Sequence, residues 1–141
     1  AKKHNADLVI ALKVDSYKNE KANGVATYYY GRDDKGVRSV VGERFANLLQ
    51  REICARTDLL NCRTHAKSWE LLRLTSAPAV RIDLGYLSSP QDAKRLASAA
   101  FRDQLAEAII VAIQRLYLSA EADAKTGTLK ISDLRRAGLR N

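Results

Sequence analysis

Two stretches in the first third of the chain are mostly apolar. Residues 7–14 and 25–30, the latter reading VATYYY, are rich in β-branched and aromatic side chains, which is typical of strands in a layered sheet. We expect the first of them to be a parallel strand covered on both faces. A third strand is predicted at 79–87, AVRIDLGYL, because Pro78 precedes it and proline is tolerated where a strand begins.

Three other segments repeat their apolar residues at helical spacing. Residues 37–56 carry one apolar stripe and residues 101–117 carry another. Between them, Ser89 is placed as an N-cap and Pro90 as the first helical residue, so a further helix is predicted to begin there. The stripe residues are Val41, Phe45, Leu48, Leu49 and Ile53 in the first helix, and Phe101, Leu105, Ile109, Ile113 and Leu116 in the last.

The polar stretch 57–68 is expected to be a loop, and residues 69–74 a short strand whose Trp69 packs in the core. Strands that alternate with helices predict an α/β layered domain, with a mostly parallel sheet flanked by helices. We place this domain at residues 1–118 and expect it to be the C-terminal part of a larger one. Residues 119–141 lose the apolar pattern and are predicted to be a basic, flexible tail.

Composition narrows the classes of partner. The chain has 141 residues, 46% of them hydrophobic, and a net charge of +8. The charges are spread along the sequence without a nucleic-acid-binding module, so we expect no nucleic-acid partner. No apolar run approaches the ~20 residues of a membrane span. The sequence leaves open whether its two cysteines, Cys54 and Cys62, form a disulfide, although the position of Cys54 on an apolar helix face favours a buried thiol.

Candidate chemistry lies at the carboxyl ends of two predicted strands. Alternation places Arg81 and Asp83 on one face of their strand, and Lys13 lies near the end of the first strand. If the two strands are neighbours, Asp83 is expected to neutralise Lys13. Arg81 is an equally good partner for Asp83, a shared cluster of all three is another alternative, and Lys13 alone can extend into solvent.

Four stretches carry a family resemblance over residues 6–118. These stretches resemble the amidase-3 family of zinc-dependent N-acetylmuramoyl-L-alanine amidases. In chain order they read ADLVIALKVDS, NGVATYYYG, LLRLTSAPAVRIDLGYLSSPQDAKRL and AEAIIVAIQRLY. The resemblance implies an amidase-3-like fold and an enzyme that cuts the bond between muramic acid and the stem peptide of peptidoglycan.

Two positions depart from the family's pattern. Lys13 stands where the family has a zinc-binding histidine, and Asp83 stands where it has a catalytic glutamate. The family's other two zinc ligands belong to a segment that precedes Ala1. A protonated lysine offers zinc no lone pair, and the shorter Asp83 moves a general base away from its water. We therefore expect an inactive homologue without catalytic residues, metal or cofactor; the alternative is a working zinc amidase outside the membrane.

Degenerate actinobacterial members of this family are similar in NGVATYYYG, IDLGYLSSPQD and KTGTLKISDL. This resemblance implies a cytoplasmic regulator that activates a MurA-type enolpyruvyl transferase after phosphorylation by a PknB-like Ser/Thr protein kinase, with a phosphothreonine-binding FHA protein as a further partner. Thr126 and Thr128 are the candidate phosphorylation sites, although an inert tail is the alternative. Candidate residues for docking the tail are Lys125, Lys130, Arg135 and Arg136.

Overall fold

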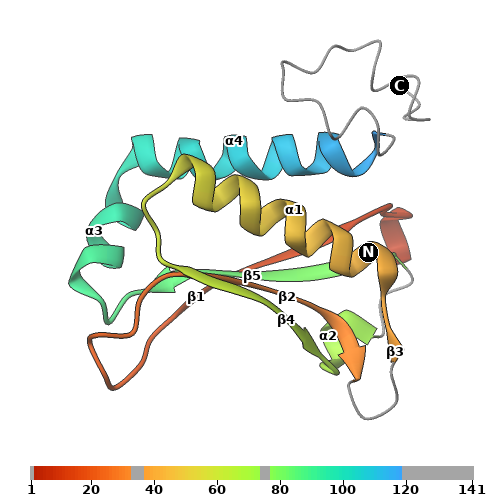
Figure 1. Ribbon diagram of the computed structural model, residues 1–141, viewed down its shortest axis with the longest axis horizontal. Helices are drawn as coiled ribbons and strands as arrows, with labels where there is room; N and C mark the ends of the chain where they lie inside the picture. The colour runs from red at the N-terminus through yellow and green to blue at the C-terminus, as the bar shows by residue number, and fades with distance from the viewer. Residues whose placement is uncertain (1, 33–36, 74–76, 119–141) are drawn as a thin grey trace.

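The computed structural model describes residues 2–32, 37–73 and 77–118, which form one sheet with two long helices packed on one of its faces (Figure 1). The strands are β1 (Val9–Asp15), β2 (Val25–Arg32), β3 (Val37–Arg38), β4 (Asn61–Lys67) and β5 (Ala79–Tyr86). The helices are α1 (Val40–Arg56), α2 (Glu70–Arg73), α3 (Pro90–Ala97) and α4 (Ala99–Leu116), after a 3-10 turn at Lys2–His4. The layered α/β fold expected from the sequence is confirmed.

The sheet is mixed. Its main order is β1-β5-β2-β4, and β3 forms a short antiparallel pair with the end of β2. The pairs β1/β5 and β2/β4 are parallel, whereas β2 and β5 are antiparallel, so the predicted mostly parallel sheet consists of two parallel halves joined at an antiparallel seam. The expected adjacency of the first and last predicted strands is confirmed, because Lys13 lies opposite Asp83.

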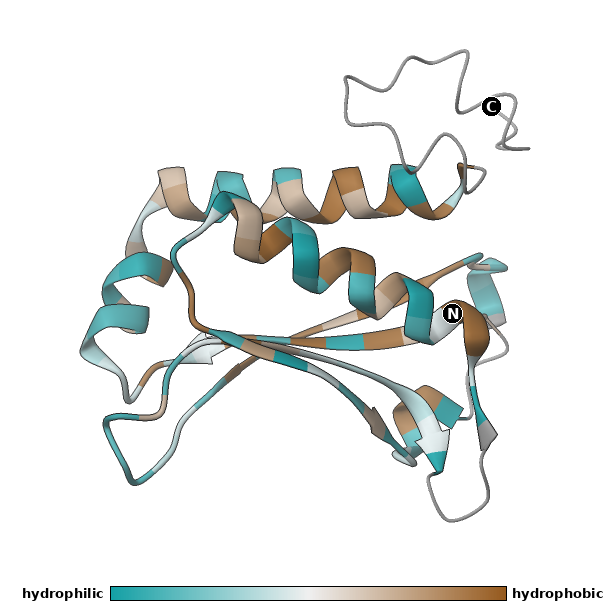
Figure 2. Cartoon of the chain, viewed as in Figure 1, coloured by the Kyte–Doolittle hydropathy of each residue, from teal (hydrophilic) through white to brown (hydrophobic). Residues whose placement is uncertain are grey.

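The hydrophobic core lies between the sheet and the helix pair α1/α4. The stripes predicted for both helices face inward, although Val41 at the start of the first stripe remains 45% exposed. Apolar residues are distributed accordingly along α1, α4 and β5 (Figure 2). Burying these side chains is the main favourable term in folding. The large apolar side chains of the core that are fully enclosed are those of Val25, Phe45, Leu49, Ile53, Val80 and Ile82.

A buried carboxylate joins α1 to α4. Glu52 is only 6% exposed and lies 3.0 Å from the Nε of Arg115 on α4. Arg56, one turn further along α1, also forms a salt bridge with Glu52, and the more exposed Arg51 approaches it to 3.6 Å. Because a carboxylate is buried at high cost unless it is paired, these arginines explain why Glu52 is tolerated between the two helices.

Asp92 joins α3 to two strands. Its Oδ2 accepts hydrogen bonds from the backbone N–H of Gly24 at 2.9 Å and of Tyr86 at 3.1 Å, while Oδ1 accepts from Arg95. Gly85 adopts φ +135°, and a Cβ there would lie 3.1 Å from Asp92 Oδ2. The predicted start of α3 is confirmed, since the Ser89 hydroxyl accepts from the Asp92 N–H.

Three sequence expectations were wrong about local structure. The stretch 57–68 contains strand β4 rather than a loop, and residues 70–73 form helix α2 rather than a strand. β4 was missed because its residues alternate between exposed and half-buried positions with mostly polar side chains. The first helix starts at Val40, where Ser39 caps it, and not at residue 37.

β1 also differs from its expected environment. Its residues are half-buried or exposed, because within the described residues it pairs only with β5 and lies at the edge of the sheet. No helix among the described residues is long and apolar enough to cross a membrane. The predicted tail at 119–141 lies outside the described residues.

Candidate functional site

The candidate residues lie on the sheet face that points away from α1. On β2, Thr27 hydrogen-bonds to Gln50 of α1, so its neighbour Tyr28 projects from the opposite face. Tyr28 lies opposite Arg81 of β5 on one side and His65 of β4 on the other. The next row of the same face places Lys13 opposite Asp83. These residues therefore form two adjacent rows across the strands.

Arg81 and Asp83 form a two-pronged ion pair. The Nε of Arg81 donates to Oδ1 of Asp83 at 2.9 Å, and its Nη2 donates to Oδ2 at 3.1 Å. The Asp83 side chain is 9% exposed and that of Arg81 is 20% exposed. This parallel geometry is the strongest arrangement available to a guanidinium and a carboxylate. It occupies both oxygens of Asp83.

Aromatic rings hold the guanidinium in place. The Cζ of Arg81 lies 3.9 Å from the ring centroid of Trp69 and 5.1 Å from that of Tyr28, so two rings with negatively polarised faces contact one cation. The Trp69 and Tyr28 rings are 4.8 Å apart, and His65 lies 5.6 Å from Tyr28. Trp69 is half-buried against this charged cluster, and the prediction that it packs in the core was wrong.

Lys13 does not form the ion pair that we expected with Asp83. Its ammonium lies 4.0 Å from Asp15, with 47% of the side chain exposed, and Arg81 takes the place expected for it. Two physical causes explain the difference. Arg81 is already two residues from Asp83 on the same strand face, and the register between β1 and β5 shifts after Lys13. Lys13 is tolerated at the strand end because it is solvated.

Proton binding at Tyr28 reflects this environment. Burial raises the pKa of the Tyr28 phenol first, and the negative charge of Asp83 raises it further, while Arg81 opposes both. Burial also raises the pKa of Tyr86, whose ring is half-buried at the end of β5. Both phenols therefore remain protonated donors at neutral pH and are not candidates for a nucleophile there.

The zinc ion implied by the family resemblance does not fit these residues. The Lys13 ammonium has no lone pair for zinc, and the Arg81 guanidinium that bridges both oxygens of Asp83 supplies the counter-charge of this carboxylate and would repel a divalent ion. His65 is exposed, and its Nε2 lies 2.7 Å from the carbonyl oxygen of Cys62. Among the described residues no three His, Cys, Asp or Glu side chains are grouped so that they could hold a metal.

The other sequence-predicted residues are either apart from this cluster or outside the described part. Cys54 and Cys62 are free, half-buried thiols, and burial raises the pKa of each. Sequence reasoning missed Tyr28 and Trp69 as neighbours of Arg81, and His65 as a neighbour of Tyr28. The alternation of β2 contained the signal for Tyr28, whereas Trp69 and His65 required the positions of β4 and α2. The remaining candidates lie outside the described residues: Thr126, Thr128, Lys125, Lys130, Arg135 and Arg136.

Comparison with known proteins gives consistent results. A family model for N-acetylmuramoyl-L-alanine amidase matches residues 1–115. The chain is 43% identical over 129 residues to N-acetylmuramoyl-L-alanine amidase CwlM of Mycobacterium tuberculosis, a match that covers 92% of this chain and 32% of that protein. It is 29% identical over 113 residues to the probable cell wall amidase LytH of Staphylococcus saprophyticus, covering 80% of this chain and 36% of that protein. The chain thus spans about a third of the length of these curated relatives.

Solved structures share the fold. N-acetylmuramoyl-L-alanine amidase AmiC2 of Nostoc punctiforme superposes with a TM-score of 0.69 at 29% identity, over 80% of this chain and 59% of that one. The catalytic domain of CwlV from Bacillus (Paenibacillus) polymyxa gives a TM-score of 0.70 at 24% identity, over 81% and 59%. The arrangement of sheet and helices described above is therefore one that solved amidases adopt.

Proposed function

The chain belongs to the N-acetylmuramoyl-L-alanine amidase family, and from this premise we propose that it is a catalytically inactive member that regulates peptidoglycan precursor synthesis. The observation that carries the proposal is the Arg81–Asp83 pair. Asp83 stands at the position of the family's catalytic glutamate, and a general base must have an oxygen available for the proton it removes. Here both oxygens already accept from a guanidinium that two aromatic rings hold in place, which restricts the directions from which a water could approach the carboxylate.

Lys13 supports the same proposal from the neighbouring strand. It stands where the family has a zinc-binding histidine, and its ammonium would repel a divalent ion. Its Cα lies directly opposite that of Asp83, so both departures from the family's pattern affect one location. A catalytic zinc site uses about three protein ligands, and the loss of one weakens it severely.

The tail is the proposed regulatory element. The match to CwlM covers 129 of the chain's 141 residues, so it extends at least to residue 129 even if it starts at residue 1. Thr126 and Thr128 therefore fall within it, beyond the family model's last matched residue at 115. In our proposal a PknB-like kinase phosphorylates them in the cytoplasm. The modified chain then binds and activates a MurA-type enolpyruvyl transferase, and an FHA protein reads the same phosphothreonines.

An activation assay tests this proposal. The phosphorylated full chain is expected to stimulate the enolpyruvyl transferase, while the unphosphorylated chain and the phosphatase-treated chain are not. Replacing Thr126 and Thr128 together by alanine should abolish stimulation, and Ser119→Ala serves as the matched control in the same tail. Undiminished stimulation by the double alanine variant would refute the tail mechanism.

The second candidate is a zinc amidase acting on peptidoglycan outside the membrane, which the names of the relatives favour. Calorimetric titration with zinc and a digest of purified muropeptides separate the two functions. We expect no stoichiometric zinc binding and no released stem peptide, with an active family amidase as the positive control. Binding of one zinc per chain together with release of stem peptide would establish the amidase instead.

A further inference from the structure

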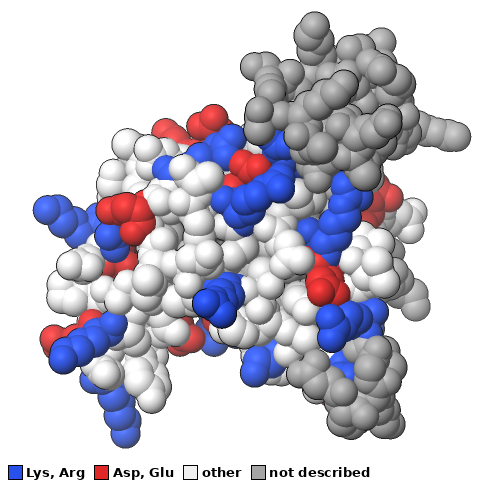
Figure 3. All heavy atoms as spheres, in the orientation of Figure 1, with Lys and Arg blue, Asp and Glu red and all other residues white. Residues whose placement is uncertain are grey.

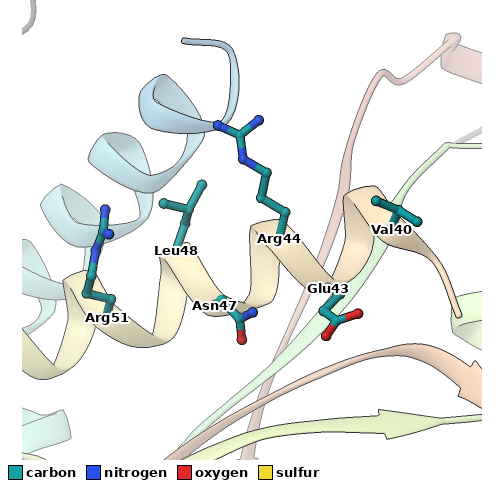
Figure 4. A pocket seen from close by; sticks show the side chains of 6 residues that line it. All are labelled: Val40, Glu43, Arg44, Asn47, Leu48 and Arg51. Atoms are coloured by element: carbon teal, nitrogen blue, oxygen red, sulfur yellow. The ribbon is translucent and has the colours of Figure 1, made fainter. Parts of the chain in front are cut away.

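A hollow of about 510 Å³ lies between α1 and β4, on the α1 side of the sheet. The Asp83 cluster lies on the other face of the sheet, so the hollow is a separate feature. Asn47 extends from α1 toward the strands, whereas Arg51, which also lines the hollow, extends from the other side of the helix and is engaged by Glu52 (Figure 4). The other residues that line the hollow include Gln50, Cys54, Asn61, Arg63 and Thr64.

Two asparagine side chains present hydrogen-bond donors to this hollow. The Oδ1 of Asn61 accepts from the backbone N–H of Arg63 at 2.9 Å and from the Nε2 of Gln50 at 2.8 Å. Because a backbone N–H can only donate, this contact fixes which end of the Asn61 amide is the oxygen. The Oδ1 of Asn47 accepts from the Thr64 hydroxyl at 2.9 Å. Among the described residues nothing accepts from the Nδ2 of either asparagine, so both remain available as donors.

Gln50 fixes the orientation of Asn61. It is only 5% exposed, and its Nε2 donates to the carbonyl oxygen of Val25 as well as to Asn61. Its Oε1 accepts from the Thr27 hydroxyl at 2.9 Å. Both ends of this amide are thus engaged, and the amide oxygens around the hollow are all occupied. The group that fits the remaining donors is a hydrogen-bond acceptor.

The charge beside the hollow is positive. Arg63 is exposed, and among the described residues no carboxylate forms an ion pair with it. Its φ is +68°, and β4 contains one extra residue between the pairs Val25/Asn61 and Thr27/Thr64. A bulge of this kind redirects a side chain, here that of Arg63 to the hollow. On the face shown in Figure 3, basic side chains lie over the strands below α1 among mostly uncharged atoms. An anionic acceptor is therefore favoured.

β4 has an open edge beside the same hollow. Within the described residues it pairs only with β2, so the backbone N–H and C=O groups of every second residue point away from the sheet. Such an edge can take up another extended chain. The bulge at Arg63 and the exposed cation Lys67 oppose pairing with most strands but attract an acidic one.

We propose that an extended acidic segment of a partner protein adds to the open edge of β4 and places one carboxylate in the hollow. The carboxylate accepts from the Nδ2 of Asn47 and Asn61 and from the guanidinium of Arg63. Backbone hydrogen bonds along the edge supply affinity for any extended chain, and the donors of the hollow select the acidic side chain. This inference goes beyond the proposed function and does not depend on phosphorylation or on a target enzyme.

Peptide titration of the isotope-labelled full chain, followed by NMR, tests the proposal. The probe is the acetylated and amidated peptide Thr-Glu-Thr-Glu-Thr, whose glutamates lie on one face of an extended strand. We expect it to shift the side-chain amide signals of Asn47 and Asn61 and to slow exchange at alternate amides of β4. Thr-Gln-Thr-Gln-Thr should bind roughly five- to tenfold more weakly, because hydrogen bonds to a charged acceptor are the stronger ones.

Exchanges of asparagine for aspartate separate binding from loss of structure. Asn47→Asp and Asn61→Asp keep every hydrogen bond that these side chains accept, but each removes a donor and adds a repelling charge, so each should weaken peptide binding roughly tenfold. Asn19→Asp, the same exchange at an exposed loop residue, is the matched control and should change affinity by less than about twofold. Arg63→Asn, which tolerates the left-handed backbone, should weaken binding roughly three- to tenfold.

Four results would overturn the proposal. They are no binding at roughly 10 mM peptide, equal affinity for the glutamate and glutamine peptides, undiminished binding by Asn47→Asp, and acetate that binds as tightly as the peptide. The last result would mean that the edge of β4 contributes nothing. None of them bears on activation of an enolpyruvyl transferase, so the two proposals fail separately.

Discussion

Replacing Asp83 by asparagine tests the central cluster most directly. The substitution keeps the size of the side chain and one hydrogen-bond acceptor, but it leaves the Arg81 guanidinium without a counter-charge. Arg81 is only 20% exposed, so water compensates for little of that loss. The expected result is a less stable domain in which Arg81 still contacts Trp69 and Tyr28.

The structure sets the size of the effect. Removing one partner of a buried ion pair costs about 3–5 kcal/mol. Here the remaining exposure of Arg81, its two aromatic contacts and the asparagine oxygen all reduce the penalty, so we expect a loss of about 2–3 kcal/mol. For a domain of this size that corresponds to a fall in Tm of roughly 6–12 °C.

Urea unfolding followed by tryptophan fluorescence is the assay, because Trp69 is the only tryptophan and contacts Arg81. A double-mutant cycle with Arg81→Gln isolates the pair, and a coupling energy of at least ~1.5 kcal/mol is expected. Asp15→Asn is the control, since its pair with Lys13 is exposed and should change stability by less than about 0.5 kcal/mol. Asp83→Asn should also lower the pKa of Tyr28. Additive effects in the cycle, or an Asp83→Asn chain as stable as the parent, would refute the reasoning.

Three further predictions concern the fold. Gly85→Ala should lower the free energy of unfolding by about 2–3 kcal/mol in thermal unfolding, because φ at this position is +135° and the new Cβ would lie 3.1 Å from Asp92 Oδ2. A smaller loss of stability than that caused by Ala97→Gly at an exposed position would contradict this prediction. Glu52→Gln should cost about 2 kcal/mol in urea unfolding, because it removes the negative charge that Arg115 and Arg56 contact between α1 and α4. Glu107→Gln, at an exposed site on α4, should change little. The free energy of unfolding should fall as pH rises above about 9. In the folded chain the pKa values of two thiols and two phenols lie above the ordinary 9.0 and 10.0, so the unfolded chain loses these protons first; the groups are Cys54, Cys62, Tyr28 and Tyr86. A free energy of unfolding that does not change between neutrality and pH ~11 would count against the burial of these groups.

The elements that could be predicted from the sequence are those in which apolar side chains occupy the buried positions. β2, β5 and the two long helices carry strong apolar patterns, and all four are present close to their expected bounds. β4 was missed because an edge strand needs few apolar residues, and its inward positions are Cys62, Thr64 and Ala66. Such a strand is stabilised by its pairing with β2, which a local pattern does not reveal.

The candidate site was predicted in part for a related reason. Strand alternation and family position identified Arg81, Asp83 and Lys13, and the opposition of Lys13 to Asp83 is confirmed. The choice of partner depended on a register shift in β1 and on the packing of Trp69 over Arg81, and neither has a local sequence signal. Charge alone made Lys13 and Arg81 equivalent, whereas the planar guanidinium fits a carboxylate with two bonds and an ammonium does not.

The carboxylate of Asp92 connects Gly24 at the start of β2, Tyr86 at the end of β5 and the first turn of α3, which are separated by up to 68 residues of sequence. Opening of α3 therefore exposes the backbone amides at both strand ends in the same event. These amides should behave as one cooperative unit whose opening free energy is shared, even though most of the residues between them belong to other elements. The protection of the Tyr86 amide at the end of β5 should therefore follow the stability of α3.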